Sequence, residues 1–370
     1  MKRLSKQVNA FFALLRAGLW EQGVRLLPLE PLDFTTLYDL ADEQSVVGLL
    51  AAGLEHVEDR KVTKPEALPF LKKVFSLESR NESMNRFIGE TVARMREAGI
   101  NALLVKGQGV AQCYTRPLWR SAGDVDFFFD ELNYEKARAF LIPLAESVDS
   151  EEKRKKHQAM TINSWVVELH GLMPTEFSER VNAGIEDVQK DIFENGNVRV
   201  WRNGDVDVFL PSPDNDIFII FTHFLQHFFV GGVGLRQIAD WCRLLWTYRE
   251  EIDHNLLESR LRKMGIMLEW KAFAHFAVSY MGMPDGAMPL YESSTSLERK
   301  SRRICRLILK TGNMGHNMDQ SYRRRYPKLI EKSITFWRRL GEFCYLSMVF
   351  PLDAPRFFLT YVGRRTKAAF

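Results

Sequence analysis

Residues 120–130 read RSAGDVDFFFD, and this run restricts the possible fold more than any other part of the chain. A valine followed shortly by three consecutive phenylalanines is typical of a β-strand that lies in the core. Successive side chains of a strand point to opposite faces, so Asp124 and Asp126 share one face while Val125 points to the other. The run therefore predicts a core strand that carries two neighbouring carboxylates.

Strand-like and helical patterns are unevenly distributed along the 370 residues. Segments typical of strands occur between about residue 100 and residue 210, at NALLVKG, DVDFFF, SWVVELHGLM and VRVWRNGDVDVFLPSP. Elsewhere the apolar residues recur mainly at helical spacing. We therefore expect an α+β fold. Its small mixed β-sheet core should occupy residues 86–210, between an N-terminal helical region at 1–85 and a C-terminal helical domain with a basic tail at 211–370.

Two apolar stretches raise the question of export or membrane insertion. In residues 1–20 the apolar patch is broken by Arg16 and no small-residue cleavage site follows, which favours an amphipathic helix over a signal peptide. Residues 216–235 include an aspartate, a glutamine and two histidines, whereas a membrane helix needs about 20 mostly uninterrupted apolar residues. We expect a buried core helix there. Four scattered cysteines without metal-ligand spacing fit a reducing compartment, and the expected location is cytoplasmic.

The net charge of +4 is concentrated at one end of the chain. Residues 321–370 contain 11 Lys and Arg against 3 Asp and Glu, a net of +8, so the rest of the chain sums to −4. A basic segment rich in aromatic residues suits contact with a polyanion such as nucleic acid, a membrane surface or a phosphorylated carrier. A helical end that packs its aromatic residues and exposes its arginines to water would have the same composition.

The tetrapeptide GDVD occurs a second time, at residues 204–207. Here it follows Asn203, and Asn-Gly between two strand-like segments is a strong signal for a type I′ hairpin turn. Asp205 and Asp207 would then lie just after the turn on an exposed face. We interpret this copy as part of a hairpin and the copy at Asp124 as the functional one.

The first copy has a third acidic residue downstream of it. In WVVELH, Glu168 and His170 share one strand face, and Glu168 is flanked by apolar residues. An unpaired carboxylate is costly there, so Glu168 forms a structural salt bridge or, if its strand lies beside DVDFFF, joins Asp124 and Asp126. Repulsion among buried carboxylates costs several kcal/mol, which a divalent cation removes. Mg²⁺ prefers carboxylate and phosphate oxygens, so these three residues are the candidate metal ligands.

Upstream of the first copy, LLVKGQG predicts an apolar strand that ends in a glycine-containing turn. Backbone N–H groups at such a turn can bind phosphate. Lys106 and Gly107 are therefore candidates for binding a phosphorylated ligand, and a simple strand-to-helix turn with a hydrated lysine is the alternative.

The order of these segments resembles the uncharacterised nucleotidyltransferases of the DNA polymerase beta-like superfamily. The resemblance covers about residues 100–172 and rests on the following features: VKGQG, Tyr114, Pro117, Arg120, GDVDFFF and VVELH. A looser feature is a helix with His223 and His227 followed by Arg236 and Asp240. Where the superfamily usually has Gly-Ser or Gly-Gly, this chain has Gly107-Gln108.

The resemblance implies transfer of a nucleoside monophosphate from an NTP to an acceptor hydroxyl. Asp124, Asp126 and Glu168 would be catalytic and would hold two Mg²⁺ ions, with Mn²⁺ as an alternative. Lys106, Gly107 and Arg120 would contact the triphosphate. The acceptor stays open among a small molecule, a sugar, a protein and an RNA end. Two other interpretations are a catalytically inactive relative that binds a nucleotide or partner, and a two-metal phosphohydrolase or nuclease.

The histidines and the arginine–aspartate pair of the helical part are expected to line the acceptor pocket. His223 and His227 are spaced i, i+4 and could bind zinc, but the glutamate of HExxH is missing, so a core or substrate-lining role is favoured. Arg236 and Asp240 have the same spacing, which predicts an ion pair between them. His170 could orient Glu168 or contact the substrate, but a structural role is favoured.

Overall fold

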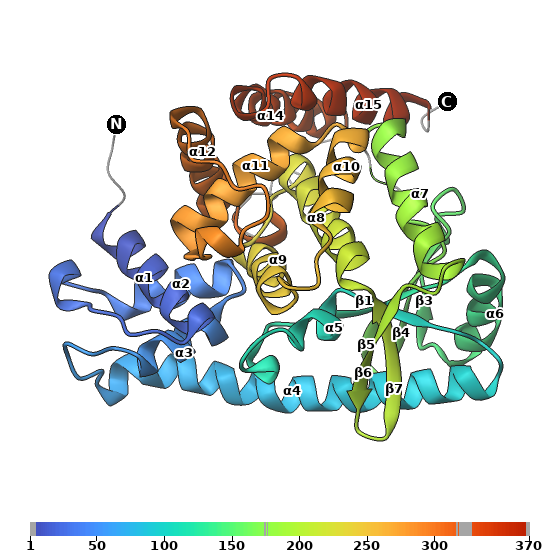
Figure 1. Ribbon diagram of the computed structural model, residues 1–370, viewed down its shortest axis with the longest axis horizontal. Helices are drawn as coiled ribbons and strands as arrows, with labels where there is room; N and C mark the ends of the chain where they lie inside the picture. The colour runs from blue at the N-terminus through green and yellow to red at the C-terminus, as the bar shows by residue number, and fades with distance from the viewer. Residues whose placement is uncertain (1–4, 174, 176, 316, 318–327, 368–370) are drawn as a thin grey trace.

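Helices surround one mixed β-sheet in this protein (Figure 1). The computed structural model describes residues 5–173, 175, 177–315, 317 and 328–367. The strands of the described part are β1 (Leu103–Val105), β2 (Asp124–Phe128), β3 (Ser147–Val148), β4 (His157–Ile162), β5 (Trp165–His170), β6 (Val198–Asn203) and β7 (Val206–Pro211). They form a single sheet in the order β3-β4-β5-β2-β1-β7-β6. The expected α+β fold with a small mixed sheet is confirmed.

The run DVDFFF forms β2, the middle strand of this sheet. β2 pairs in parallel with β5 and antiparallel with β1. Val125 and Phe127 enter the apolar cluster beneath helices α4 and α6, whereas Phe128 on the other face packs edge-on against Phe193 of α7. Full burial of each such side chain stabilises the fold by roughly 1.5–3 kcal/mol. β2 is therefore anchored on both faces, and its two carboxylates are held on a rigid element.

The N-terminal part is helical, as expected. Its helices are α1 (Lys6–Trp20), α2 (Phe34–Glu43), α3 (Val47–Glu55) and α4 (Lys64–Glu97). Within the segment at 1–20, residues Lys6–Trp20 form α1, a helix with most of its apolar residues buried. Figure 1 shows α4 running from beneath the N-terminal helices to the sheet, where its second half covers one sheet face. The boundary predicted at residue 85 falls inside this continuous helix.

Further helices lie between the strands and make up the C-terminal part. They are α5 (Gly107–Ala111), α6 (Glu131–Leu141), α7 (Glu179–Phe193), α8 (Pro213–Val230), α9 (Leu235–Thr247), α10 (His254–Met264), α11 (Met267–Phe276), α12 (Thr295–Thr311), α14 (Lys328–Val349) and α15 (Asp353–Lys367). The apolar window at 216–235 lies mostly in α8, whose Phe221 packs against Trp241 and Trp270. It is a buried core helix, as predicted. Within the described residues, the search for a helix able to cross a bilayer finds none.

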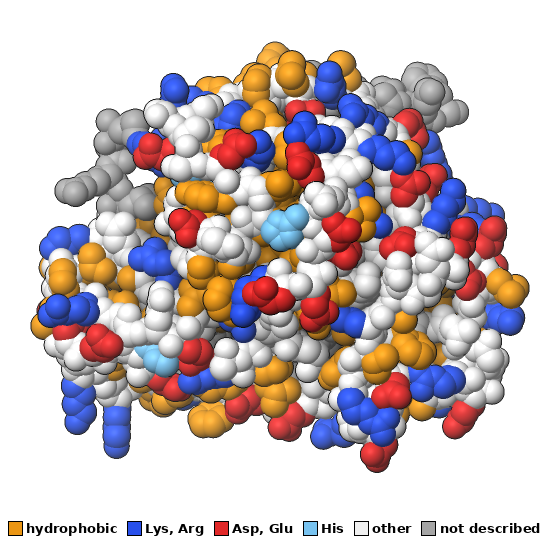
Figure 2. Space-filling model, viewed as in Figure 1, with side chains coloured by type: hydrophobic (Ala, Val, Ile, Leu, Met, Phe, Trp, Pro, Cys, Tyr) orange, Lys and Arg blue, Asp and Glu red, His pale blue; other side chains and the backbone are white. Residues whose placement is uncertain are grey.

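The basic tail at 321–370 is described only in part, because residues 321–327 and 368–370 lie outside the described residues. In the remainder, Phe350 and Phe357 pack against Phe229 of α8. Aromatic side chains of the tail therefore contribute to the core. On the face seen in Figure 2, basic and acidic side chains are interspersed. Contact of the tail with a polyanion stays a prediction.

Candidate active site

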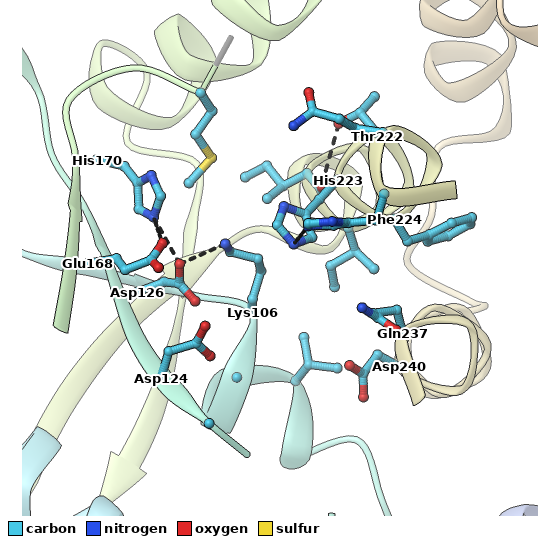
Figure 3. A pocket seen from close by; sticks show the side chains of 18 of the residues that line it. Lys106, Asp124, Asp126, Glu168, His170, Thr222, His223, Phe224, Gln237 and Asp240 are labelled. Carbon is cyan, nitrogen blue, oxygen red and sulfur yellow. Dashed lines mark hydrogen bonds and ion pairs between the residues drawn. The ribbon is translucent and has the colours of Figure 1, made fainter. Parts of the chain in front are cut away.

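A cavity of about 480 Å³ lies between the middle of the sheet and helices α8 and α9 (Figure 3). Its volume falls in the range of about 300–1,000 Å³ that is usual for small-molecule sites. One wall carries Lys106, Asp124, Asp126, Glu168 and His170, and the opposite wall carries Thr222, His223, His227, Arg236, Gln237 and Asp240. The sequence segments chosen as functional, which are up to about 130 residues apart in the chain, thus meet around one space.

The three acidic residues lie on adjacent strands. In the parallel pairing of β2 with β5, Asp126 stands beside Glu168, and Asp124 is on the same face of β2 two residues earlier. Asp126 is 3% exposed, whereas Asp124 and Glu168 are half-buried. The condition set by the sequence, that the ELH strand runs beside the DVD strand, is met. Their catalytic and metal-binding roles stay predictions.

Asp126 is the best-connected of the three carboxylates. Its Oδ1 accepts hydrogen bonds from Lys106 Nζ at 2.7 Å and from His170 Nε2 at 2.8 Å (Figure 3). Burial opposes ionisation of this carboxyl, but the Lys106 ammonium and the bond from His170 outweigh it and lower the pKa of Asp126. Asp126 is therefore ionised at neutral pH.

Asp124 has the opposite electrostatic environment. Repulsion from Asp126, followed by burial, raises the pKa of the Asp124 carboxyl. In the part of the chain that the structure describes, the Asp124 carboxylate has no hydrogen bond or ion pair. The group of three carboxylates is thus compensated mainly by one lysine. Oxygen donors that repel one another, with one of them unpaired, are a donor set suited to a divalent cation such as Mg²⁺.

Lys106 is held in an unusual backbone conformation, with φ 57° and ψ −144°, at the turn between β1 and α5. A non-glycine residue in this region is strained by about 1–3 kcal/mol, and such strain often accompanies a functional site. The next residue, Gly107, also has positive φ (39°). The side chain of Gln108 points away from the cavity, where its Nε2 donates to Asn81 Oδ1 at 2.8 Å. Gln108, which stands where the superfamily usually has serine or glycine, therefore packs in the protein interior and does not fill the cavity beside the turn.

Arg120, expected to contact phosphate, forms a buried network with α9. Its Nε and Nη2 donate to both carboxylate oxygens of Asp240 at 2.7 Å, and Tyr114 donates to the same residue at 2.7 Å. Nη1 of Arg120 bonds the carbonyl of Ser121. Its guanidinium is thus occupied by protein acceptors, and phosphate contact by Arg120 stays a prediction that requires this network to open.

The predicted ion pair between Arg236 and Asp240 is wrong. Asp240 pairs with Arg120, and Arg236 Nη1 donates to the carbonyl of Ser121 at 3.0 Å, while Nε of Arg236 is buried without a hydrogen-bond partner. The i, i+4 rule describes isolated helix surfaces, but α9 packs against the loop that carries Arg120. A bidentate buried contact is stronger than an exposed one along a helix.

On the opposite wall, His223 and His227 of α8 lie side by side, with their Nε2 atoms 3.1 Å apart. Burial is the main cause that lowers the pKa of both imidazoles, to about 4 for His227. Both are therefore neutral at pH 7. Their place on the cavity wall fits the expected substrate-lining role.

The second GDVD copy lies outside this cavity. It belongs to the β6–β7 hairpin, in which Asn203 pairs with Val206, so the two-residue loop is Gly204-Asp205. Gly204 has positive φ (59°), which fits a type II′ turn with glycine first rather than the type I′ turn expected. Asp207 pairs with Arg202 on an exposed face. The prediction that this copy belongs to a β-hairpin is confirmed.

His157 is a site residue that the sequence analysis did not identify. It follows the charged run at 151–156 and begins β4, which lies beside β5. Nε2 of His157 donates to Glu168 Oε2 at 3.2 Å, and this bond is the largest of the effects that lower the pKa of Glu168. The available signal was weak: of HQAMTI, Met160 and Ile162 are the larger apolar residues at alternate positions, and both are buried in β4.

Comparison with known proteins gives one family match. A family model described as "Uncharacterised nucleotidyltransferase" matches residues 30–282. Among solved structures, the chain is similar to an antigenic nucleotidyltransferase-like protein from Paracoccidioides brasiliensis. The two are 12% identical, with a TM-score of 0.33, and the match covers 60% of this chain and 96% of that chain. The comparison with curated proteins gives no match. Because the family match spans more than half of its length, this chain belongs to the uncharacterised nucleotidyltransferase family.

Proposed function

We propose that this protein transfers a nucleoside monophosphate from an NTP to an acceptor hydroxyl, in a reaction that depends on Mg²⁺. Family membership supports the general nucleotidyl-transfer function. The observation that carries the proposal is the register of β2 with β5, which sets Asp126 beside Glu168, with Asp124 on the same face, at the wall of a cavity. Two-metal transferases need this arrangement of acidic residues.

Asp124, Asp126 and Glu168 would hold the ions, and Mn²⁺ could replace Mg²⁺. When bound, such ions polarise the triphosphate and lower the pKa of the attacking hydroxyl. Glu168 is ionised and lies on the cavity wall, so its carboxylate is placed to accept the proton of that hydroxyl. His157 orients Glu168 through the bond to Oε2.

The positive charge beside the carboxylates comes from Lys106 and Arg236. Both line the cavity, and Lys106 stays protonated because Asp126 raises its pKa against the effect of burial. These cations would compensate the charge of the triphosphate and of the leaving pyrophosphate. Gly107 would let the triphosphate approach the backbone of the turn. Arg120 would hold α9, and with it the far wall, through Asp240.

The first test is calorimetry with the Mg²⁺ complexes of non-hydrolysable ATP, GTP, CTP and UTP analogues. We expect one of them to bind wild-type protein only with Mg²⁺, and to bind D124N/D126N much more weakly. Equal affinity of both proteins for the analogue would mean that the nucleotide binds away from Asp124 and Asp126. Absence of binding to wild type would favour the inactive relative.

Product analysis then separates transfer from hydrolysis. With the preferred NTP labelled at the α-phosphate and a mixture of cell-extract acceptors, transfer produces pyrophosphate and a labelled acceptor. A phosphohydrolase would produce free inorganic phosphate or a free nucleotide with no labelled acceptor, and that outcome would overturn the proposal.

A further inference from the structure

Two imidazoles and a carboxylate converge next to the proposed Mg²⁺ ligands. β4 and β5 are antiparallel neighbours, and their register sets His157 opposite His170, with imidazole centroids 4.9 Å apart. Glu168 lies between them on the same face of the sheet. The ligand atoms of these three residues all lie within 4.8 Å of one another. All three side chains are half-buried and line the cavity, so an ion can reach them.

The separations between these atoms suit a single bound ion. Nε2 of His157 is 3.2 Å and Nε2 of His170 is 3.5 Å from Oε2 of Glu168. His170 Nε2 is also 2.8 Å from Asp126 Oδ1. Two ligands that are each about 2.1 Å from one ion lie about 3.0 Å apart in octahedral and about 3.4 Å apart in tetrahedral coordination. The separations of Glu168 Oε2 from the two Nε2 atoms match the edges of such a coordination shell.

Hydrogen bonding alone accounts less well for this arrangement. Both histidines direct Nε2 towards the same oxygen of Glu168, and the contact from His170 is longer than an ordinary N–H···O bond of about 2.7–3.2 Å. Nε2–H of His170 is already directed at Asp126, so it cannot serve both carboxylates well.

The ligand types indicate the class of ion. Imidazole nitrogen suits first-row transition metals, whereas Mg²⁺ prefers an all-oxygen shell with several waters. We propose that His157, Glu168 and His170 form a transition-metal site that takes an ion of the Zn²⁺ class, bound in place of the hydrogen bonds that the two Nε2 atoms make. Asp124 and Asp126 remain the Mg²⁺·NTP position. The assignment of this site as the second ion position rests on the proposed function, because the two positions share Glu168.

The test is a titration of the untagged, metal-free full chain with Co²⁺, which absorbs visible light when nitrogen ligands bind it. Wild type is compared with H157Q and with H223Q/H227Q, the other close histidine pair on the cavity wall. We expect one Co²⁺ per chain, with affinity at least about 10-fold weaker in H157Q and unchanged in H223Q/H227Q. Equal affinity in wild type and H157Q, or loss only in H223Q/H227Q, would overturn the proposal. So would absence of Co²⁺ binding to wild type.

A second measurement needs no variant. In wild-type protein with ¹⁵N-labelled histidine, paramagnetic Co²⁺ should first broaden the resonances of His157 and His170 among the eight histidines. Broadening confined to other histidines would contradict the site.

Mg²⁺·NTP-analogue binding is measured on the same samples, so that the two proposals can fail separately. Wild type that binds Co²⁺ at His157 but no nucleotide would keep the metal site and overturn the proposed function. Wild type that binds the nucleotide analogue but no Co²⁺ would keep the proposed function and overturn the metal site.

Discussion

The two GDVD copies, 123–126 and 204–207, have the same four residues and opposite environments. Asp126 lies on the middle strand of the sheet, is 3% exposed and has Glu168 beside it. Asp207 lies in a hairpin near the sheet edge and pairs with Arg202, whose side chain is 61% exposed. Both copies lead into apolar residues, and in the sequence only the Asn203-Gly204 turn signal sets the second copy apart. The strands on either side of a DxD strand decide whether its carboxylates form a site.

The largest expected difference between the copies is in nucleotide binding. D124N/D126N removes two charges from the proposed metal position, and metal contacts to a triphosphate contribute several kcal/mol. We expect the affinity for the Mg²⁺·NTP analogue, measured by calorimetry, to fall at least about 100-fold. The matched D205N/D207N protein should bind as wild type does. A similar loss in both proteins would mean that the effect arises from net charge and not from a site.

The next difference is in stability. It lies between the buried ion pair of Arg120 with Asp240, near the first copy, and the exposed ion pair of Arg202 with Asp207 in the second copy. D240N weakens the buried partner of Arg120, and loss of one member of a buried ion pair costs about 3–5 kcal/mol. D207N removes the partner of Arg202 at an exposed position, where ion pairs contribute little. Urea unfolding should show a clear drop in the free energy of unfolding for D240N and none for D207N, with equal m-values. A D240N protein as stable as wild type would show that the Arg120 network does not hold α9.

Part of the fold and of the candidate site could be predicted from the sequence. Strand type, the hairpin and the shared face of Asp124 and Asp126 were predictable, because they depend on period-two patterns and turn residues within short segments. The adjacency of Glu168 to Asp126 was an open condition, because it depends on β5 pairing with β2. The partner of Asp240 was not, because Arg120 is 120 residues away and the nearer candidate, Arg236, satisfied a local rule. His157 was hidden by the charged residues before it. What local pattern cannot supply is which strands and helices become neighbours.

A third difference is in acid sensitivity. The first copy faces His227, whose pKa is lowered to about 4, whereas an unfolded histidine titrates near 6.5. Between these values the unfolded state binds more protons, so stability is full above pH 6.5 and falls as the pH drops towards 4. The shift corresponds to about 3 kcal/mol for this residue. Thermal unfolding between pH 7 and 4.5 should show a smaller pH-dependent loss in H223Q/H227Q than in wild type. H254Q, at an exposed helix start, should follow wild type.

The smallest effects come from two glycines: Gly107, whose turn lies next to the first copy, and Gly204, the first residue of the second copy. Gly107 and Gly204 both have positive φ, 39° and 59°, and an added Cβ would meet only the Asp124 carbonyl at 3.6 Å in the first case and open space in the second. The substitutions G107A and G204A therefore cost mainly backbone strain, about 1 kcal/mol each, measurable by urea unfolding. Their effects on nucleotide affinity should differ, because the Lys106–Gly107 turn lines the cavity whereas the hairpin loop does not. We expect weaker binding of the Mg²⁺·NTP analogue in G107A alone. If G107A and G204A bind nucleotide equally well, the turn before α5 does not contact the triphosphate, and charge compensation would rest on the Lys106 and Arg236 side chains.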